Sequence, residues 1–221
     1  MSAIVLASAS PRRRELLAGL GFEVDVMVHD IDEKNFDNAE PSQRVVDLAM
    51  AKAKCVLAEG RTNKSLILGA DTLVCDPSPY PPDSSEFSDE SGSLTLGKPR
   101  DREEAAKMLR LLAGRTHSVH TGIAVIDPTQ KREEWGLSTS QVRFAALSKA
   151  EIEDYLDSGE WEGVAGAYRI QGLAALFIEE IRGSWSGIVG LPIHELYAIL
   201  TRLSIKPPAL LLGEFPLFGA R

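Results

Sequence analysis

Apolar residues along this chain alternate between short continuous runs and stretches in which they recur every three or four positions. This alternation predicts strands and helices in turn, as in an α/β fold. The predicted strands are residues 4–7, 22–28, 66–74, 118–126, 138–146 and 173–181. The predicted helices cover residues 11–17, 41–57, 101–113 and 192–203, and a further one opens at 148. We therefore expect a mixed β-sheet with flanking helices.

The run at 66–74 is apolar on both faces of its alternation, which indicates a buried central strand, yet it contains Asp71. A carboxylate there is costly unless a metal, a base or hydrogen bonds compensate it, so the position favours a functional role. Lys52 lies on the apolar face of the preceding predicted helix. A lysine that extends along that face to solvent is the plainer interpretation of this residue.

The segment after the central strand has a different composition from the rest of the chain. Residues 76–93 hold five acidic residues, four prolines, six serines and no basic residue. Such a composition does not form a packed element, and it predicts an exposed acidic loop at 76–95. We expect one catalytic domain over residues 1–205, with this loop inserted and an irregular tail at 206–221.

Composition and charge exclude several classes of protein. The chain has 221 residues, of which 44% are hydrophobic and 25% charged, as in ordinary globular proteins. A net charge of −8 argues against nonspecific nucleic-acid binding, which needs an excess of Lys and Arg. No apolar run approaches the ~20 residues that cross a bilayer, and residues 1–7 lack the features of a signal peptide. Cys55 and Cys75 alone form no disulfide framework, so a cytoplasmic location is expected.

Several common catalytic motifs are missing. The sequence has no phosphate-binding P-loop, no dinucleotide fingerprint and no zincin helix motif. The segment Gly183–Gly187 resembles a nucleophile elbow only superficially, because Trp185 stands where the serine must lie.

The residues from Ser8 to Arg13 fall between a predicted strand and a predicted helix. Unpaired N–H groups and the positive end of a helix attract anions there, and two guanidiniums can add forked hydrogen bonds. A capped helix with solvated arginines is the alternative interpretation. Arginine in a first turn opposes the helix dipole, which favours an anionic ligand. Elsewhere, Glu33 and Asp71 could together hold a divalent cation that also binds substrate phosphates.

Five separated segments carry a recognisable pattern. They are LASASPRRRELL at 6–17, GADT at 69–72, KP at 98–99, AGAYRIQG at 165–172 and VGLP at 189–192. In order and content they resemble the Maf family of nucleoside triphosphate pyrophosphatases, over residues 3 to about 203. The resemblance implies an elongated, inosine-triphosphatase-like (Maf/Ham1) fold with a cleft between two lobes. It also implies hydrolysis between the α- and β-phosphates, with a divalent metal such as magnesium or manganese.

The resemblance also assigns roles to individual residues. It makes Asp71 the proton acceptor and gives Glu33 an assisting role with metal or water, so both are candidate metal ligands. The residues that would hold phosphates are Ser8, Arg12, Arg13, Lys52 and Lys98.

Three positions bear on the substrate. Arg12, Thr72 and Gln171 resemble the family branch that acts on dTTP and UTP rather than the branch for methylated GTP. An amide can pair with both a donor and an acceptor on a pyrimidine edge, whereas a glutamate offers only acceptors. Modified pyrimidine nucleotides are further candidate substrates.

The chain departs from the family pattern beside one motif. Gly163 and Val164 stand where many members have an acidic residue and a lysine, and Arg169 replaces a usual glycine. If Arg169 does not restore the lost basic group, phosphate affinity or base preference will differ.

Two alternatives to this function stay open. One is a nonenzymatic nucleotide-binding regulatory protein. The presence of Asp71, Glu33 and Lys98 argues against it. The other is a pyrophosphatase that removes modified purine triphosphates. The expected partners are a nucleoside triphosphate and a second copy in a homodimer, without nucleic acid or membrane.

Overall fold

The computed structural model describes residues 3–36, 39–60, 65–75 and 94–208. Its strands are β1 (Ala3–Leu6), β2 (Glu23–Val26), β3 (Leu66–Cys75), β4 (Thr95–Leu96), β5 (Thr116–Asp127), β6 (Arg132–Phe144) and β7 (Ile178–Arg182). Its α-helices are α1 (Pro11–Gly19), α2 (Pro41–Ala58), α3 (Arg102–Leu112), α4 (Lys149–Asp157), α5 (Trp185–Val189) and α6 (Ile193–Arg202). Short 3-10 helices are η1 (Glu33–Phe36), η3 (Ala165–Ala167) and η4 (Leu173–Phe177).

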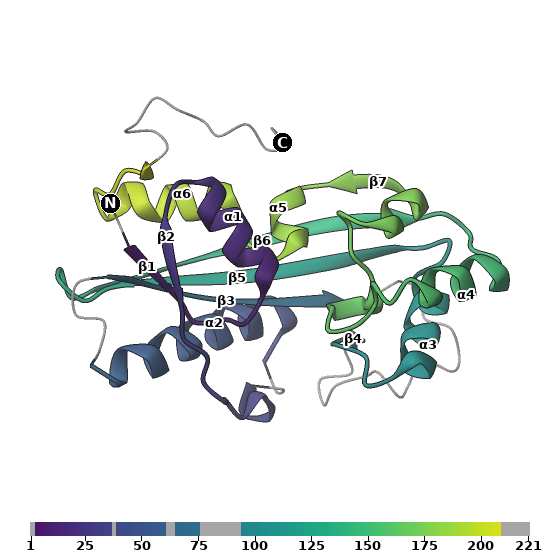
Figure 1. The fold of residues 1–221 in the computed structure, drawn as a ribbon, viewed down its shortest axis with the longest axis horizontal. Coiled ribbons are helices and arrows are strands. Elements are labelled where there is room, and N and C mark those ends of the chain that lie inside the picture. The colour runs from purple at the N-terminus through teal and green to yellow at the C-terminus, as the bar shows by residue number, and fades with distance from the viewer. Residues whose placement is uncertain (1–2, 37–38, 61–64, 76–93, 209–221) are drawn as a thin grey trace.

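The strands form a mixed seven-stranded sheet, which confirms the predicted fold class. Its order is β2-β1-β3-β5-β6-β7, and β4 pairs with β3 beside this path. β1 is parallel to β2 and β3, whereas the later pairs are antiparallel. Figure 1 shows an elongated molecule along β5 and β6, with α2 on one face of the sheet and α1, α5 and α6 on the other. α3 and α4 lie together at one end.

Two glycines allow α2 to approach the sheet closely. A Cβ atom at Gly69 would collide with the carbonyl oxygen of Ala49, and one at Gly122 with that of Val45. Gly122 is also the cross-strand partner of Asp71. Because alternate residues of a strand face the same side, Asp71 points with Gly69 toward α2, and Thr72 points to the opposite face.

Several predicted helix starts are confirmed by their caps. Ser148 forms a capping box with Glu151, and Asp101 accepts a hydrogen bond from the backbone of Glu104 at 2.9 Å. Ser10 caps α1, with Pro11 as its first residue.

One predicted element is largely wrong. The segment predicted as a strand at 173–181 begins with the 3-10 helix η4, and the strand β7 covers only Ile178–Arg182. Leu173–Phe177 contains no β-branched residue, so its apolar character carried no real preference for a strand. The helix α5 and the short strand β4 were not predicted, and β6 begins six residues earlier than expected, at Arg132.

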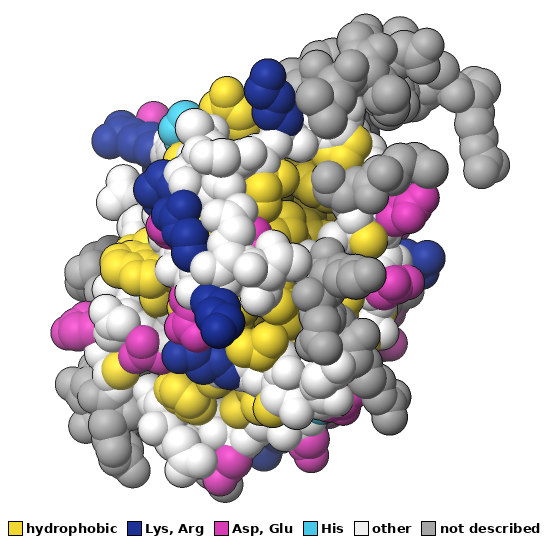
Figure 2. Space-filling view, turned by 90° about the vertical axis from the view of Figure 1, so that its left-hand side faces the viewer, with side chains coloured by type: hydrophobic (Ala, Val, Ile, Leu, Met, Phe, Trp, Pro, Cys, Tyr) yellow, Lys and Arg dark blue, Asp and Glu magenta, His cyan; other side chains and the backbone are white. Residues whose placement is uncertain are grey.

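The limits of the described residues bear on two predictions. The acidic segment 76–93 and the tail beyond 208 lie outside them, so the single domain over 1–205 stays a prediction. Within the described part of the chain, no helix is both long and apolar enough to cross a membrane. Figure 2 views the left-hand end of Figure 1, where Lys and Arg side chains gather beside a hollow with hydrophobic side chains on its floor.

Candidate active site

A cleft of about 1000 Å³ brings all the predicted site residues together. The predicted residues that line it are Ser8, Arg12, Arg13, Glu33, Lys52, Asp71, Thr72, Lys98 and Gln171. We call residues 7–13 with Thr72 the first wall of the cleft. Residues 162–171, which run through η3, form the second wall, and Lys98 enters from the segment after β4.

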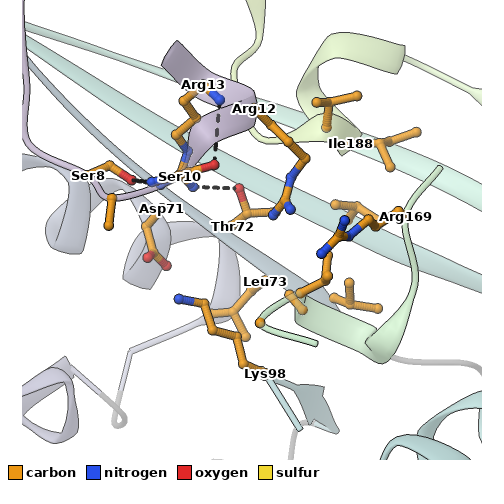
Figure 3. Close-up of a pocket in the computed structure, with 18 of the residues that line it drawn as sticks. Ser8, Ser10, Arg12, Arg13, Asp71, Thr72, Leu73, Lys98, Arg169 and Ile188 are labelled. Atoms are coloured by element: carbon orange, nitrogen blue, oxygen red, sulfur yellow. Dashed lines mark hydrogen bonds between the residues drawn. The ribbon is translucent and has the colours of Figure 1, made fainter. Parts of the chain in front are cut away.

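The first wall is held together by Arg13. Its Nη1 donates to Ser8 Oγ at 2.7 Å, and its Nη2 donates to Thr72 Oγ1 at 3.1 Å. Its Nε donates to the carbonyl oxygen of Gly190 at 2.8 Å. The bond to Thr72 joins α1 to β3 (Figure 3). The bond to Gly190 joins α1 to the turn that follows α5. Burial lowers the pKa of Arg13 below its ordinary value, and the nearby Asp71 opposes this shift.

The VGLP segment owes its place in the site to this contact. Gly190 ends α5 with a φ of 118°, a left-handed conformation that favours glycine. Its carbonyl oxygen thereby faces Arg13. Thr121 adds a second link, because its Oγ1 donates to the carbonyl of Gly187 at 2.8 Å and lies 3.0 Å from Thr72 Oγ1. Sequence reasoning missed Thr121, which no motif marks.

Arg12 differs from its neighbour, because it extends into the cleft (Figure 3). Burial lowers the pKa of Arg12, and the positive charge of Arg169 lowers it further. Arg169 lies on the second wall, facing Arg12. Val164 also lines the cleft, but its side chain is apolar and buried. The basic group on this wall is therefore supplied by Arg169.

Asp71 forms an ion pair with Lys52. The Lys52 Nζ lies 2.6 Å from Asp71 Oδ1 and 3.0 Å from Glu33 Oε1, so one ammonium joins both candidate catalytic carboxylates. The side chains of Lys52 and Asp71 are only 18% and 14% exposed, whereas that of Glu33 is 53% exposed. The close approach of α2 to Gly69 therefore provides the partner that a carboxylate in a central strand requires. Lys98 also reaches toward Asp71 (Figure 3).

The donor set is compatible with a phosphate-bound divalent cation. Among the described residues, no three His, Cys, Asp or Glu side chains come together as a metal-binding group. Asp71 and Glu33 supply two carboxylates that already share one cation, the Lys52 ammonium. Magnesium characteristically takes one or two carboxylates and completes its shell with phosphates and water. The two residues therefore fit a cation that arrives with a triphosphate.

Comparison with known proteins identifies the family of the chain. The model of a family described as Maf-like protein matches residues 3–203. The chain belongs to the Maf family. It is 43% identical to the dTTP/UTP pyrophosphatase of Desulforamulus reducens, over 93% of this chain and 99% of that protein. It is 39% identical to the dTTP/UTP pyrophosphatase of Treponema denticola, with the same coverage.

Solved structures give a more distant likeness. A HAM1 protein from Coxiella burnetii matches 91% of this chain and 100% of its own, with 19% identity and a TM-score of 0.46.

Proposed function

We propose that this Maf-family protein hydrolyses dTTP and UTP between the α- and β-phosphates, releasing the monophosphate and pyrophosphate. The observation that carries the proposal is the Asp71 carboxylate, which lies in a cleft bordered by cationic side chains on several sides. The two relatives named dTTP/UTP pyrophosphatase support the choice of substrate. A protein that only binds nucleotides needs no carboxylate at this position.

The site residues divide the work of the reaction. Asp71 accepts a proton from the attacking water, as a carboxylate within hydrogen-bond reach can do. Lys52 holds Asp71 and Glu33 in place. The phosphates are bound by Ser8, Arg12, Arg13 and Lys98. Three of the five guanidinium N–H groups of Arg13 already bond within the protein, so only the remaining ones are available to a phosphate.

We further propose that catalysis uses magnesium or manganese, which Asp71 and Glu33 would hold together with the phosphates. When bound, such a cation neutralises negative charge on the phosphates and on the leaving group. A cytoplasmic location is also proposed, and the free thiols of Cys55 and Cys75 support it. Formation of a homodimer is a further proposal, for which sedimentation velocity is the test.

The test is product analysis with a panel of nucleoside triphosphates, in the presence and absence of magnesium. We expect UTP and dTTP to yield monophosphate and pyrophosphate, with far higher kcat/KM than ATP, GTP or inosine triphosphate. Preference for a purine would contradict the proposed substrate. Binding of UTP without any turnover would instead favour a regulatory nucleotide-binding protein. Loss of turnover in Asp71→Asn, purified and assayed in parallel, would show that the hydrolysis belongs to this protein and not to a contaminating hydrolase.

Gln171 gives the substrate proposal a sharper test. Its side chain is exposed and lines the cleft, so its amide is available to a base edge. Gln171→Glu removes the amide donor, and we expect the preference for UTP over GTP to fall by about tenfold, the worth of one good hydrogen bond. An unchanged ranking of substrates would show that Gln171 does not read the base.

A further inference from the structure

Arg169 is placed in the cleft by contacts that leave part of its side chain unused. Its backbone N–H donates to the hydroxyl of Tyr155 at 3.1 Å, which ties the second wall to α4. One terminal nitrogen, Nη2, donates to the carbonyl oxygen of Glu162 at 3.3 Å. Its Nε is buried and has no hydrogen-bond partner. A buried donor without a partner is costly. Because this atom is closed to solvent, a ligand in the cleft meets the guanidinium at its terminal nitrogens, of which Nη1 makes no hydrogen bond to the described residues.

The position of Arg12 makes this arrangement more costly still. Arg12 and Arg169 face one another from the two walls, and both are partly buried (Figure 3). The positive charge of Arg169 disfavours the charged form of Arg12. The negative charge of Glu15 favours that form, but its effect is smaller than that of Arg169. Two guanidiniums in such an arrangement repel one another unless an anion lies between them. A neutral ligand would leave this repulsion in place.

We propose that Arg12 and Arg169 together bind the β- and γ-phosphates of the substrate, and hence the pyrophosphate product. This inference rests on the proposed function and adds Arg169 to its binding residues. The carbonyl oxygens of a pyrimidine are the competing ligand, but they carry only partial charge. Pyrophosphate offers several full charges, and its oxygens match the planar fork of a guanidinium. Two facing arginines are therefore better compensated by phosphates than by a base.

The experiment measures binding of two separate probes, inorganic pyrophosphate and UMP, by titration calorimetry in the presence of magnesium. The variants are Arg169→Gln, which removes the charge, and Arg169→Lys, which keeps the charge without the fork. Arg14→Gln is the matched control, because Arg14 is exposed on α1 and lies outside the cleft. Thermal unfolding of each variant checks that its fold is intact.

In Arg169→Gln we expect about 10- to 100-fold weaker binding of pyrophosphate, as for the loss of charge-assisted hydrogen bonds. UMP binding should change less than twofold, Arg169→Lys should be intermediate, and Arg14→Gln should match the wild type. Weaker binding of UMP with unchanged binding of pyrophosphate would overturn the proposal and assign Arg169 to the base. Unchanged binding of both probes would also overturn it. If wild-type protein binds pyrophosphate as expected but hydrolyses no nucleotide, the proposed function fails while this inference stands.

Discussion

The two walls of the cleft are stabilised by different kinds of interaction. The first wall depends on Arg13, which bonds to nearby Ser8 and, through two further hydrogen bonds, to Thr72 and Gly190, both far away in the sequence. The second wall rests on a buried cluster in which the rings of His117, Phe144 and Tyr168 pack edge to face. Within this cluster His117 Nε2 lies 2.8 Å from the hydroxyl oxygen of Tyr168. The first wall is therefore stabilised by the charged guanidinium of Arg13, whereas the second wall requires the buried imidazole of His117 to stay neutral.

This difference suits the positions of the two arginines that face each other. Arg12 lies in the first turn of α1, immediately before Arg13, whose hydrogen bonds fix this end of the helix, so its guanidinium is presented from a well-defined backbone. Arg169 follows directly from Tyr168, which is buried in the aromatic cluster. Each wall thus orients one cationic side chain toward the substrate through its neighbour in the sequence. Substitutions at Arg13 and in the aromatic cluster around Tyr168 should therefore affect the two walls separately.

The largest effect is expected from Asp71, which lies between the walls and belongs to neither support. Asp71→Asn should lower kcat by about 10²–10⁴-fold, because the amide cannot accept the proton. Lys52 keeps Glu33 as a partner, so we expect the variant to fold normally. Single-turnover cleavage of UTP, together with calorimetric binding of a nonhydrolysable UTP analogue, makes the measurement.

The magnesium dependence of that binding separates two roles. Retained binding without cleavage would support Asp71 as the base. Loss of the magnesium-dependent part of binding would indicate a metal ligand. Near-normal cleavage would show that Asp71 is a structural residue of the central strand.

The first wall can be broken at Arg13 and compared with its neighbour. Arg13→Gln should reduce the free energy of unfolding by about 2 to 4 kcal/mol, because hydrogen bonds from a charged donor are lost and their acceptors stay partly buried. Arg12→Gln should change stability by less than about 0.5 kcal/mol, since Arg12 extends into the cleft. Urea unfolding measures both, and KM for UTP shows whether Arg12→Gln weakens binding alone. Equal destabilisation by the two variants would contradict the division of roles.

The second wall should be sensitive to acid through His117. Burial lowers the pKa of His117 from its ordinary 6.5 to about 3. Between these values the unfolded chain binds a proton that the folded protein does not, so His117 makes stability fall as pH falls from about 6.5 toward 3. The limiting slope for one such group is about 1.4 kcal/mol per pH unit.

The measurement is the difference between wild type and His117→Gln in the pH dependence of urea unfolding. The variant should lose this slope whatever its absolute stability. His194→Gln, at an exposed position on α6, is the control and should keep it. A His117→Gln variant that retains the full slope would assign the acid sensitivity to other groups.

The two walls also differ in how much of each could be predicted from the sequence. The first wall is encoded locally, since a strand, a capping serine and a proline mark the start of α1, and the cluster of arginines follows at once. Asp71 was found because a carboxylate is conspicuous in an apolar run. The ties that Arg13 makes to Thr72 and Gly190 are not visible in the sequence, because they depend on how distant elements pack.

The second wall was harder to predict. Arg169 was noticed only as a departure from a family pattern, and nothing in the sequence placed it opposite Arg12. The segment at 173–177 was mistaken for a strand, because a short apolar run does not distinguish a strand from a helical turn. Lys52 was thought more typical of a lysine extending to solvent, until the close approach of α2 at Gly69 brought it to Asp71.

The smallest effect is expected from the acidic segment 76–93. Thr95 pairs directly with Cys75 on adjacent antiparallel strands, so the two ends of the segment are already neighbours. A four-residue turn rich in Asn and Gly can therefore replace it, and shortening the loop this far should raise stability by about 1 kcal/mol through lower closure entropy. We expect kcat/KM for UTP to stay within twofold of the wild-type value. Urea unfolding confirms the fold, and a matched deletion variant carrying Arg169→Gln shows whether the second wall still contributes. A folded deletion variant with lost activity would instead mean that the segment supports the second wall or Lys98, and that this wall depends on more than its aromatic cluster.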